Sequence, residues 1–201
     1  MKKVLCFGDS NTYGFVPESG KRYDKNTRWT GVLQNLLGND YQVIEAGCNG
    51  RYAFVDGTSI ETSGCKVLPR YLSNDLDFVI VSIGLNDLQI FYQITELEIR
   101  TGTEKYISII KEFAPNAKII IASPSCIKKS ILSSYFSTMF DETAINRSRI
   151  FAPIYQECAK LYGCCFVDLN SIAEVSDVDG LHYTKDGHLK IAQMFCEVLK
   201  D

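Results

Sequence analysis

Five short apolar runs, separated by longer amphipathic stretches, are the feature that most limits what this chain can fold into. The runs are rich in Val, Ile and Phe and do not alternate with polar residues, which is typical of strands buried on both faces of a parallel sheet. They cover residues 3–7, 41–46, 76–83, 117–122 and 165–169. The pattern predicts five parallel strands, each followed by a helix.

The stretches between the runs have the spacing of helices that pack one face on a sheet. In residues 184–199 the apolar side chains recur at helical intervals, with Lys and Glu on the other side. Similar stretches cover residues 29–37, 66–72, 96–113 and 142–162. No repeat or break in composition interrupts the alternation. We therefore expect one domain over residues 1–201, a three-layer α/β/α fold with a five-stranded, flavodoxin-like parallel sheet.

Charge and hydropathy exclude several classes of partner. The formal net charge is −3 at pH 7 and no run of Lys and Arg occurs, so a nucleic acid backbone has no electrostatic footprint here. No apolar run approaches the roughly 20 residues of a membrane-spanning helix. The N-terminal segment has two lysines, but too few apolar residues follow them for a signal peptide. We expect a cytoplasmic protein that binds neither nucleic acid nor membrane.

Eight cysteines are scattered along the chain without C-x-x-C spacing. Together with the missing export signal, this scatter indicates buried, reduced thiols rather than a disulfide framework. Zinc is not expected, because only His182 and His188 offer nitrogen ligands and no Cys pair has ligand spacing. The sequence therefore predicts no metal and no cofactor.

Polar clusters follow four of the five predicted strands. Gly-Asp-Ser-Asn-Thr at 8–12 follows the first, Gly-Cys-Asn-Gly-Arg at 47–51 the second, Gly-Leu-Asn-Asp at 84–87 the third, and Asp-Gly-Leu-His at 179–182 comes shortly after the fifth. Sheets of this kind bind ligands in the crevice outside the carboxyl ends of their strands. We expect the four clusters to converge on that crevice.

The clusters contain the parts that a serine nucleophile needs, namely a base, a group that orients the base, and donors for the oxyanion. Ser10 lies where a strand turns toward a helix, His182 is the natural base, and Asp179, three residues before it, can reach the imidazole. The expected oxyanion donors are the main-chain N–H groups of Ser10 and Gly50 and the side-chain amide of Asn86. Gly47 is an alternative to Gly50.

Each cluster also has a structural interpretation when taken alone. Ser10 can cap a helix, and the segment around Asn86 can form a turn through local backbone bonds. Asp9 and Asp87 are expected to cap helix starts and brace loops. His188 is expected to be a solvated or half-buried structural residue. The occurrence of all the clusters at independently predicted strand ends favours catalysis.

The blocks resemble those of the SGNH (GDSL-type) hydrolase superfamily. Residues 8–10 resemble its first block, 84–87 its G-x-N-D block and 179–182 its D-x-x-H block, in the family's order. The four letters correspond to Ser10, Gly50, Asn86 and His182. Within the superfamily, the chain is most similar to the bacterial arylesterase and acyltransferase group, whose patterns G-D-S-N-T-x-G and R-W-T-G match residues 8–14 and 28–31, and whose late segment is matched by 146–149 and 178–184.

The resemblance implies an SGNH hydrolase fold and a cofactor-free serine esterase that works through an acyl-enzyme, with acyl transfer to an alcohol as a second outcome. Short acyl groups are expected, because no long apolar lid is visible. The chain departs from the pattern at two places. Residues 47–51 replace G-x-S-G or G-x-S-A, and Asn11 stands where the GDSL string has Leu, a substitution that the arylesterase group shares.

Asn11, Trp29 and Arg51 are candidates for substrate contacts. Trp29 can line an acyl pocket or belong to the core. Arg51 can bind a substrate carboxylate, or pair with Asp56 or Glu45.

Two longer loops, residues 13–28 and 124–140, are candidates for shaping specificity. Segment 124–140 carries more apolar side chains than a solvated loop should show. It is either the wall of an acyl channel or a contact between subunits. Assembly into a homo-oligomer is therefore one of two alternatives at this point.

The competing hypothesis is a flavodoxin-like module in which residues 10–12, at a helix N-terminus, hold a phosphate or FMN. It leaves Asp179 and His182 without a role. A third hypothesis is a catalytically silent scaffold.

Overall fold

The five apolar runs form the strands of one parallel sheet in the computed structural model, which describes residues 1–200. The predicted runs differ from the observed strands by at most two residues at either end. The order across the sheet is β2-β1-β3-β4-β5. The strands are β1 (Lys2–Gly8), β2 (Tyr41–Gly47), β3 (Phe78–Ser82), β4 (Lys118–Ser123) and β5 (Cys165–Asp168).

Each face of the sheet has its own hydrophobic core. In β1, Leu5 and Phe7 belong to the core on one face, while Val4 and Cys6 belong to the core on the other. This alternation follows from the pleat of a strand, in which successive side chains point to opposite faces. All four side chains are fully buried, which explains why the runs are apolar throughout.

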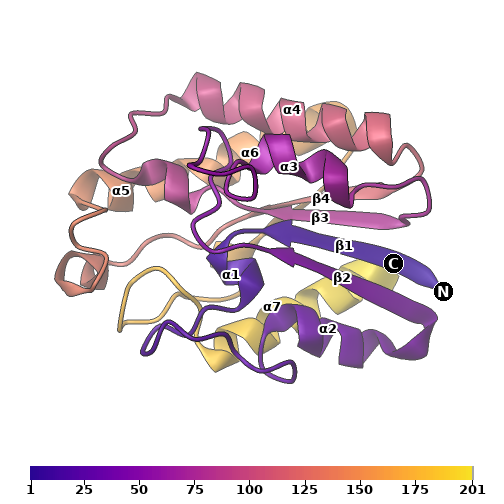
Figure 1. Cartoon of the computed structure of the whole chain (residues 1–201), viewed down its shortest axis with the longest axis horizontal. Coiled ribbons are helices and arrows are strands. Elements are labelled where there is room, and N and C mark those ends of the chain that lie inside the picture. The colour runs from indigo at the N-terminus through magenta and orange to yellow at the C-terminus, as the bar shows by residue number, and fades with distance from the viewer. Residues whose placement is uncertain (201) are drawn as a thin grey trace.

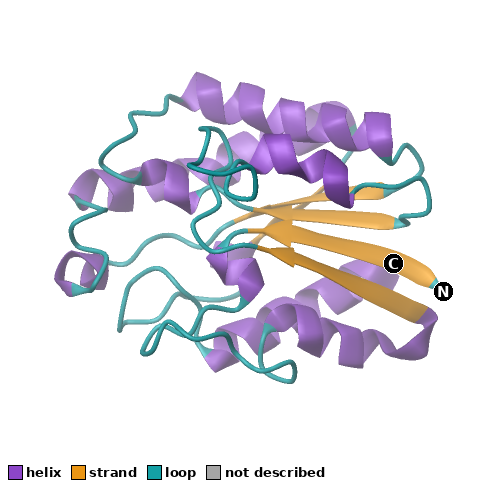
Figure 2. Cartoon of the chain, in the orientation of Figure 1, coloured by secondary structure: helices purple, strands orange, loops and turns teal. Residues whose placement is uncertain are grey.

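Helices cover both faces, so the fold has three layers (Figure 1, Figure 2). One side carries α3 (Gly64–Val67), α4 (Glu96–Phe113) and α6 (Phe151–Tyr162), and the other carries α2 (Trp29–Leu37) and α7 (Lys185–Lys200). Two short helices, α1 (Ser10–Tyr13) and α5 (Glu142–Arg147), lie toward the end of the sheet at which the strands finish. The expected α/β/α architecture is confirmed.

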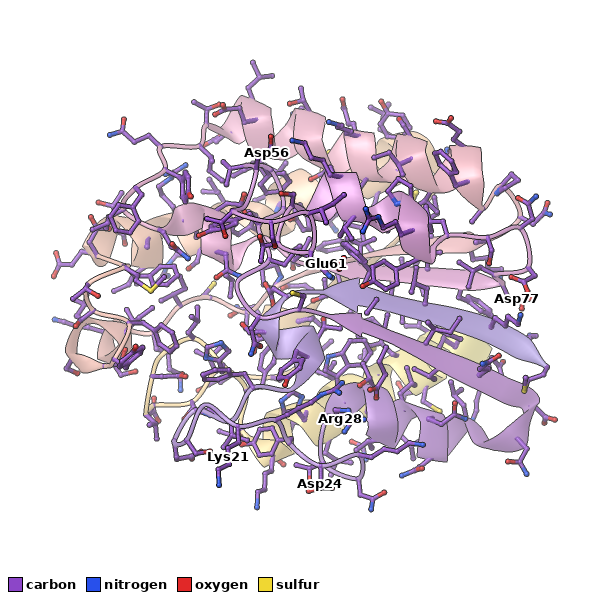
Figure 3. The ribbon with its side chains drawn as sticks, viewed as in Figure 1. Lys21, Asp24, Arg28, Asp56, Glu61 and Asp77 are labelled. Atoms are coloured by element: carbon purple, nitrogen blue, oxygen red, sulfur yellow. The ribbon has the colours of Figure 1, made fainter. Side chains whose placement is uncertain are left out.

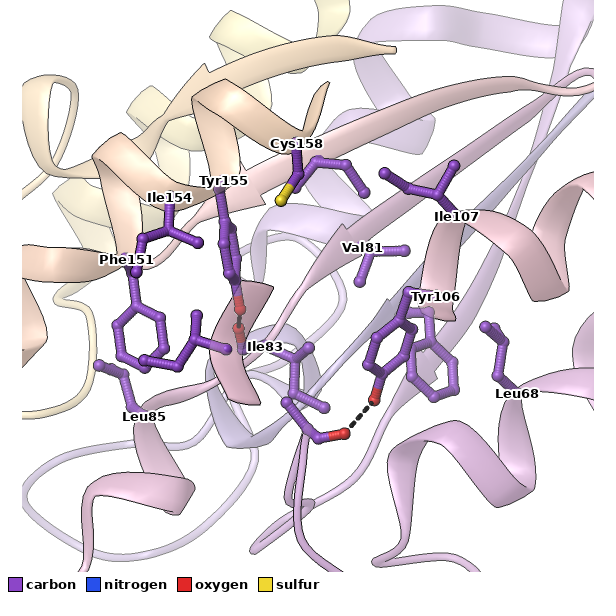
Figure 4. Packing of buried hydrophobic residues seen from close by; sticks show 14 of the residues in the cluster. Leu68, Val81, Ile83, Leu85, Tyr106, Ile107, Phe151, Ile154, Tyr155 and Cys158 are labelled. Carbon is purple, nitrogen blue, oxygen red and sulfur yellow. Dashed lines mark hydrogen bonds between the residues drawn. The ribbon is translucent and has the colours of Figure 1, made fainter. Parts of the chain in front are cut away.

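Two buried tyrosines tie helices of the first layer to the loops at the strand ends (Figure 4). The hydroxyl of Tyr106 in α4 donates to the carbonyl of Ala53 at 3.1 Å, and that of Tyr155 in α6 donates to the carbonyl of Ile83 at 2.8 Å. Burial raises the pKa of both hydroxyls well above the ordinary value. Both therefore remain protonated donors that fix the loops after β2 and β3.

The stretch 142–162 is divided into α5 and α6, although its spacing predicts a continuous helix. Pro153 lies in the first turn of α6 and has no N–H for the preceding turn. A 3-10 turn at Ser148–Ile150 joins the two helices. The hydroxyl of Ser148 accepts from the N–H of Ile127 at 3.0 Å, so the junction also anchors segment 124–140.

The structure bears on two expectations, one about the surface charge and membrane spans and one about the burial of the cysteines. Side chains of both signs lie along the face shown in Figure 3, and no helix within residues 1–200 is long and apolar enough to cross a bilayer. All eight cysteines are free. Cys6, Cys158 and Cys196 are buried as expected, but Cys48, Cys65, Cys126 and Cys164 are only half-buried. Cys165 is exposed, because it begins the strand at the edge of the sheet.

The end of β2 passes directly against α1. A Cβ atom on Gly47 would lie 2.2 Å from the main-chain nitrogen of Tyr13 and 2.5 Å from the carbonyl carbon of Thr12. Real side chains do not approach backbone so closely, so only glycine fits. This close packing seats α1 on the sheet.

Replacing Gly47 by Ala is expected to lower the free energy of unfolding by about 1–3 kcal/mol, the usual cost of overpacking, because the added methyl group meets rigid backbone. Urea denaturation measures the change. Gly187→Ala in α7 is the matched control, since its Cβ has no neighbour closer than 3.3 Å and Ala favours a helix. Equal stabilities of Gly47→Ala and the wild type would contradict the packing described.

Candidate active site

Ser10 is the first residue of α1 and directly follows the end of β1. The preceding residue, Asp9, caps the helix, and its carboxylate accepts from the N–H of Asn11 at 2.9 Å. The Oγ atom of Ser10 lies 2.8 Å from Nε2 of His182. The N–H of Ser10 is at the first helical position, which has no acceptor within the helix. The strand-to-helix turn thus brings the hydroxyl to the imidazole.

Asp179 holds His182 from within the same loop, which leads into α7. One carboxylate oxygen lies 2.7 Å from Nδ1 of His182, and the other accepts the N–H groups of Leu181 and His182 at 3.0 Å each. Burial acts to raise the pKa of Asp179, but the hydrogen bonds and charge of His182 and the neighbouring N–H groups lower it, and the net pKa lies below the ordinary value. An ionised Asp179 keeps a proton on Nδ1 and leaves Nε2 to face Ser10.

Gly50 and Asn86 follow the two strands that flank β1. Asn86, 8% exposed, lies in the 3-10 turn Leu85–Leu88, and its Nδ2 donates one of its two hydrogens to the carbonyl of Arg51 at 3.0 Å. Gly50 has φ of 68° and nothing within 4 Å of a Cβ position. Gly47, by contrast, is packed under α1. Gly50 is therefore the better placed of the two glycines to meet a ligand.

Two further carboxylates are buried and brace the loops, as the sequence predicts, but the expectation that Asp87 also caps a helix start is wrong. Asp9 caps α1, and Asp87 accepts the N–H groups of Ala53, Phe54 and Val55 at 2.6, 2.7 and 2.9 Å. Burial raises the pKa of Asp9 to about 7 and that of Asp87 to about 6. Their contacts are with main-chain N–H groups, so they fix the crevice floor.

Arg51 is 1% exposed and does not face the crevice. Its guanidinium donates to three carbonyl oxygens, those of Gly8, Ala46 and Glu61. The expected pairing with Asp56 or Glu45 is wrong, because these carboxylates pair with Lys66 and with Arg22 and Arg28. A planar cation with five donors satisfies carbonyl groups that would otherwise lack partners at the strand ends.

The other two candidates for substrate contacts are also buried. Trp29 is 2% exposed and packs against Phe195 in the core between α2 and α7, with ring centroids 5.1 Å apart. Asn11 is 5% exposed, and its amide bonds the main chain on either side of His182. The placement of all three residues is structural.

His188 is fully buried, so the expectation of a solvated or half-buried side chain is wrong. Its Nδ1 accepts the N–H of Trp29 at 3.3 Å. Burial lowers the pKa of the imidazole to about 3. The residue is therefore a neutral part of the core on the first turn of α7, where the apolar face of the helix meets α2.

Two aromatic side chains that the sequence did not single out flank the imidazole. The ring of Phe15 stacks on His182 with centroids 4.1 Å apart, and the ring of Phe136 lies 5.4 Å away. With Asp179 and the exposed Tyr135, both line a cavity of about 460 Å³. They come from the two loops expected to shape specificity, but no local motif marks them. Phe15 and Phe136 therefore form apolar walls beside the imidazole of His182.

The apolar segment 124–140 is largely covered by its own chain. Ile127, Ile131 and Phe140 are buried in the core beneath α5 and α6, which leaves Phe136 beside the imidazole. A larger cavity, of about 590 Å³, lies where this segment meets α5. Neither Ser10 nor His182 lines either cavity, but the smaller one shares Phe15, Phe136 and Asp179 with the surroundings of the imidazole.

The stability of Asp9→Asn relative to the wild type is expected to increase as the pH rises, because the wild type loses stability. The folded-state pKa of Asp9, about 7, exceeds the unfolded value of about 3.9. Its contribution is therefore fully present below about pH 4 and is lost as the pH rises through about 7. Asn remains neutral and can still cap the helix. The difference in unfolding free energy should grow by on the order of 1 kcal/mol or more between pH 5 and 8.

Urea denaturation at pH 5, 6, 7 and 8 measures this difference. Asp87 contributes the same trend to both proteins, so it largely cancels. If the difference in unfolding free energy between the two proteins were the same at every pH, the pKa of Asp9 would not be raised in the folded protein.

The sequence of this chain is similar to those of known esterases and acylhydrolases. A model of the GDSL-like lipase/acylhydrolase family matches residues 6–190. The chain is 26% identical over 212 residues to the acetylxylan esterase of Xylanibacter ruminicola, a match that covers 98% of this chain and 43% of that protein. The chain thus spans less than half the length of this curated relative.

Solved structures extend the likeness over the whole chain. The aryl esterase of M. smegmatis is 30% identical, with a TM-score of 0.92, and Est24, a carbohydrate acetylesterase from Sinorhizobium meliloti, is 26% identical with the same TM-score. Each match covers 100% of this chain and 99% of that chain. Since the family model runs from β1 into α7 and includes Ser10, Asn86 and His182, the chain belongs to the GDSL-like lipase/acylhydrolase family.

Proposed function

We propose that this protein is a serine esterase that cleaves small, short-acyl carboxylic esters through an acyl-enzyme on Ser10. The observation that carries the proposal is the buried series of contacts from Ser10 Oγ to His182 Nε2, at 2.8 Å, and from His182 Nδ1 to Asp179, at 2.7 Å. A carboxylate that orients an imidazole against a hydroxyl is the arrangement that activates serine. Family membership supports the same chemistry.

In the proposed reaction, Nε2 of His182 takes the proton of Ser10 as Oγ attacks the ester carbonyl. The imidazolium then gives that proton to the leaving alcohol, while Asp179 balances its charge. Water, deprotonated by the same nitrogen, attacks the acyl-enzyme, which releases the carboxylic acid and restores Ser10. The N–H groups of Ser10 and Gly50 and the amide of Asn86 stabilise the oxyanion in both steps.

The ester is proposed to bind with its carbonyl at Ser10 and the rest of the molecule toward the cavity that Phe15, Phe136 and Asp179 line. Phe15 and Phe136 give it apolar walls close to the base, and walls of this kind keep water from the acyl-enzyme. An alcohol can then compete with water as the acceptor, so acyl transfer is the secondary outcome. The names acetylxylan esterase and carbohydrate acetylesterase, borne by similar proteins, support acetyl as the acyl group.

A phosphate or FMN module is not favoured. α1 is only four residues long, the hydroxyl of Ser10 is bonded to His182, and the side chains of Asn11 and Thr12 are buried. A phosphate would have to displace these contacts. A cytoplasmic location and assembly into a homo-oligomer stay predictions.

Incubation with a fluorophosphonate probe, followed by peptide mass analysis, is expected to place the label on Ser10. Ser10→Ala and His182→Ala should each lower kcat for p-nitrophenyl acetate by about 10⁴-fold or more, because nucleophile and base act as a unit. Ser73→Ala is the matched control, since Ser73 precedes β3 at the opposite end of the sheet, and it should retain full activity. Robust ester cleavage by Ser10→Ala would refute the proposal.

Phe136→Ala is expected to widen the acyl preference, because it removes a wall next to the imidazole. The ratio of kcat/KM for p-nitrophenyl hexanoate to that for the acetate should rise by about tenfold, in the range that pocket methylenes contribute to discrimination. Phe113→Ala, an exposed Phe at the far end of α4, is the control. An unchanged ratio in Phe136→Ala would contradict the prediction, because Phe136 would then not contact the acyl group.

A further inference from the structure

We infer that Asn11 is a positioning residue that sets the placement of the base relative to the nucleophile, an inference that rests on the proposed function. The amide of Asn11 binds both peptide groups that flank His182. Its Nδ2 donates to the carbonyl of Leu181 at 3.1 Å, and its Oδ1 accepts the N–H of Tyr183 at 3.1 Å. Asn11 itself directly follows Ser10 in the chain.

Apart from the bond to Ser10, the other hydrogen bonds of His182 do not perform this task, and the stacked ring of Phe15 makes no directional bond to its main chain. Asp179 bonds its ring and its N–H, and the N–H of Ser176 donates to its carbonyl at 2.7 Å. Both partners belong to the same loop as His182 and move with it. Apart from the bond between Ser10 and His182, the two bonds of Asn11 are the hydrogen bonds that join residues 9–14 to residues 179–183 within residues 1–200. Asn11 therefore ties the turn of the nucleophile to the loop of the base.

The residue type matches this role. An asparagine carries a donor and an acceptor on one planar group, which is what a carbonyl and an N–H two residues apart require. Asn11 is 5% exposed, so bulk water does not compete for either bond, and its own N–H is fixed by Asp9 at 2.9 Å. Leu, the residue of the GDSL string at this position, has the same number of side-chain heavy atoms but can form neither bond. Both ends of the Asn11 amide bond main chain of the loop that carries His182.

Asn11→Leu tests the inference, because it keeps the number and branching of the side-chain heavy atoms and removes both bonds. We expect kcat for p-nitrophenyl acetate to fall by about tenfold to 100-fold with KM within about twofold of wild type, since misplacing reacting groups by about 1 Å costs about 100-fold in rate. The rate at which a fluorophosphonate labels Ser10 should fall by a similar factor. Rates are expressed per folded protein, with folding checked by circular dichroism.

Asn11→Asp is the second variant. It keeps the shape and the acceptor for Tyr183, and in its ionised form it has no donor for the carbonyl of Leu181. Assayed at pH 8 and above, it should therefore also lose kcat with little change in KM. Thr12→Val is the matched control. Thr12 is the next residue, fully buried, and its hydroxyl has no hydrogen-bond partner within residues 1–200, so its kcat and labelling rate should equal those of the wild type.

Three outcomes separate the hypotheses. A folded Asn11→Leu or Asn11→Asp whose kcat and labelling rate stay within about twofold of wild type would overturn the inference. A loss of kcat shared by Thr12→Val would also overturn it, since any change in α1 would then suffice. A wild type that neither cleaves the ester nor labels at Ser10 would instead overturn the proposed function.

Discussion

The contact between Ser10 and His182 depends on bringing the beginning and the end of the chain to one edge of the sheet. β1 lies between β2 and β3, so the chain winds to one side of β1 and then returns to the other. At such a switch point the loops after adjacent strands separate and leave a crevice. Ser10 follows β1, and Asn86 follows β3 on the other side of this point. The topology thus brings Ser10 and Asn86 to opposite sides of one crevice.

The floor of this crevice is built from buried polar groups, and main-chain atoms satisfy them. The guanidinium of Arg51 donates hydrogen bonds to carbonyl groups at the ends of β1 and β2. The carboxylate of Asp87 accepts hydrogen bonds from three N–H groups of the loop after β2. Buried polar groups are costly unless they are hydrogen-bonded. The two apolar cores supply the stability on which this arrangement rests, and the result is a rigid frame around Ser10, His182 and Asp179.

Sequence reasoning worked where burial leaves a periodic or continuous signal. The strands are apolar throughout because both faces are covered, and α4 begins and ends at the predicted residues, 96 and 113. Hydrophobic periodicity does not reveal helix boundaries that a single residue sets, or helices of only one turn. Pro153 divides the stretch 142–162, and α1 is too short to show any helical period.

The candidate site divides in the same way. Ser10, Asp179, His182 and Asn86 were found because spacing and strand ends mark them. Trp29 and Arg51 were candidates for substrate contacts, each with a structural alternative. Trp29 lies in the core, which was its alternative, whereas Arg51 bonds carbonyl groups that no sequence pattern marks. Phe15 and Phe136 were missed as individual residues, since their contact with the imidazole arises from loop conformations that no period records. Loop geometry therefore limits how far the sequence alone can define specificity.

A crystal structure of the protein after reaction with a fluorophosphonate tests the central claim most directly, because the adduct imitates the tetrahedral intermediate. The expected result is a bond from Ser10 Oγ to phosphorus, with the phosphonyl oxygen about 2.7–3.1 Å from the N–H of Gly50 and Nδ2 of Asn86 and with His182 still held by Asp179. An adduct on another residue, or a phosphonyl oxygen turned away from Gly50 and Asn86, would contradict the account.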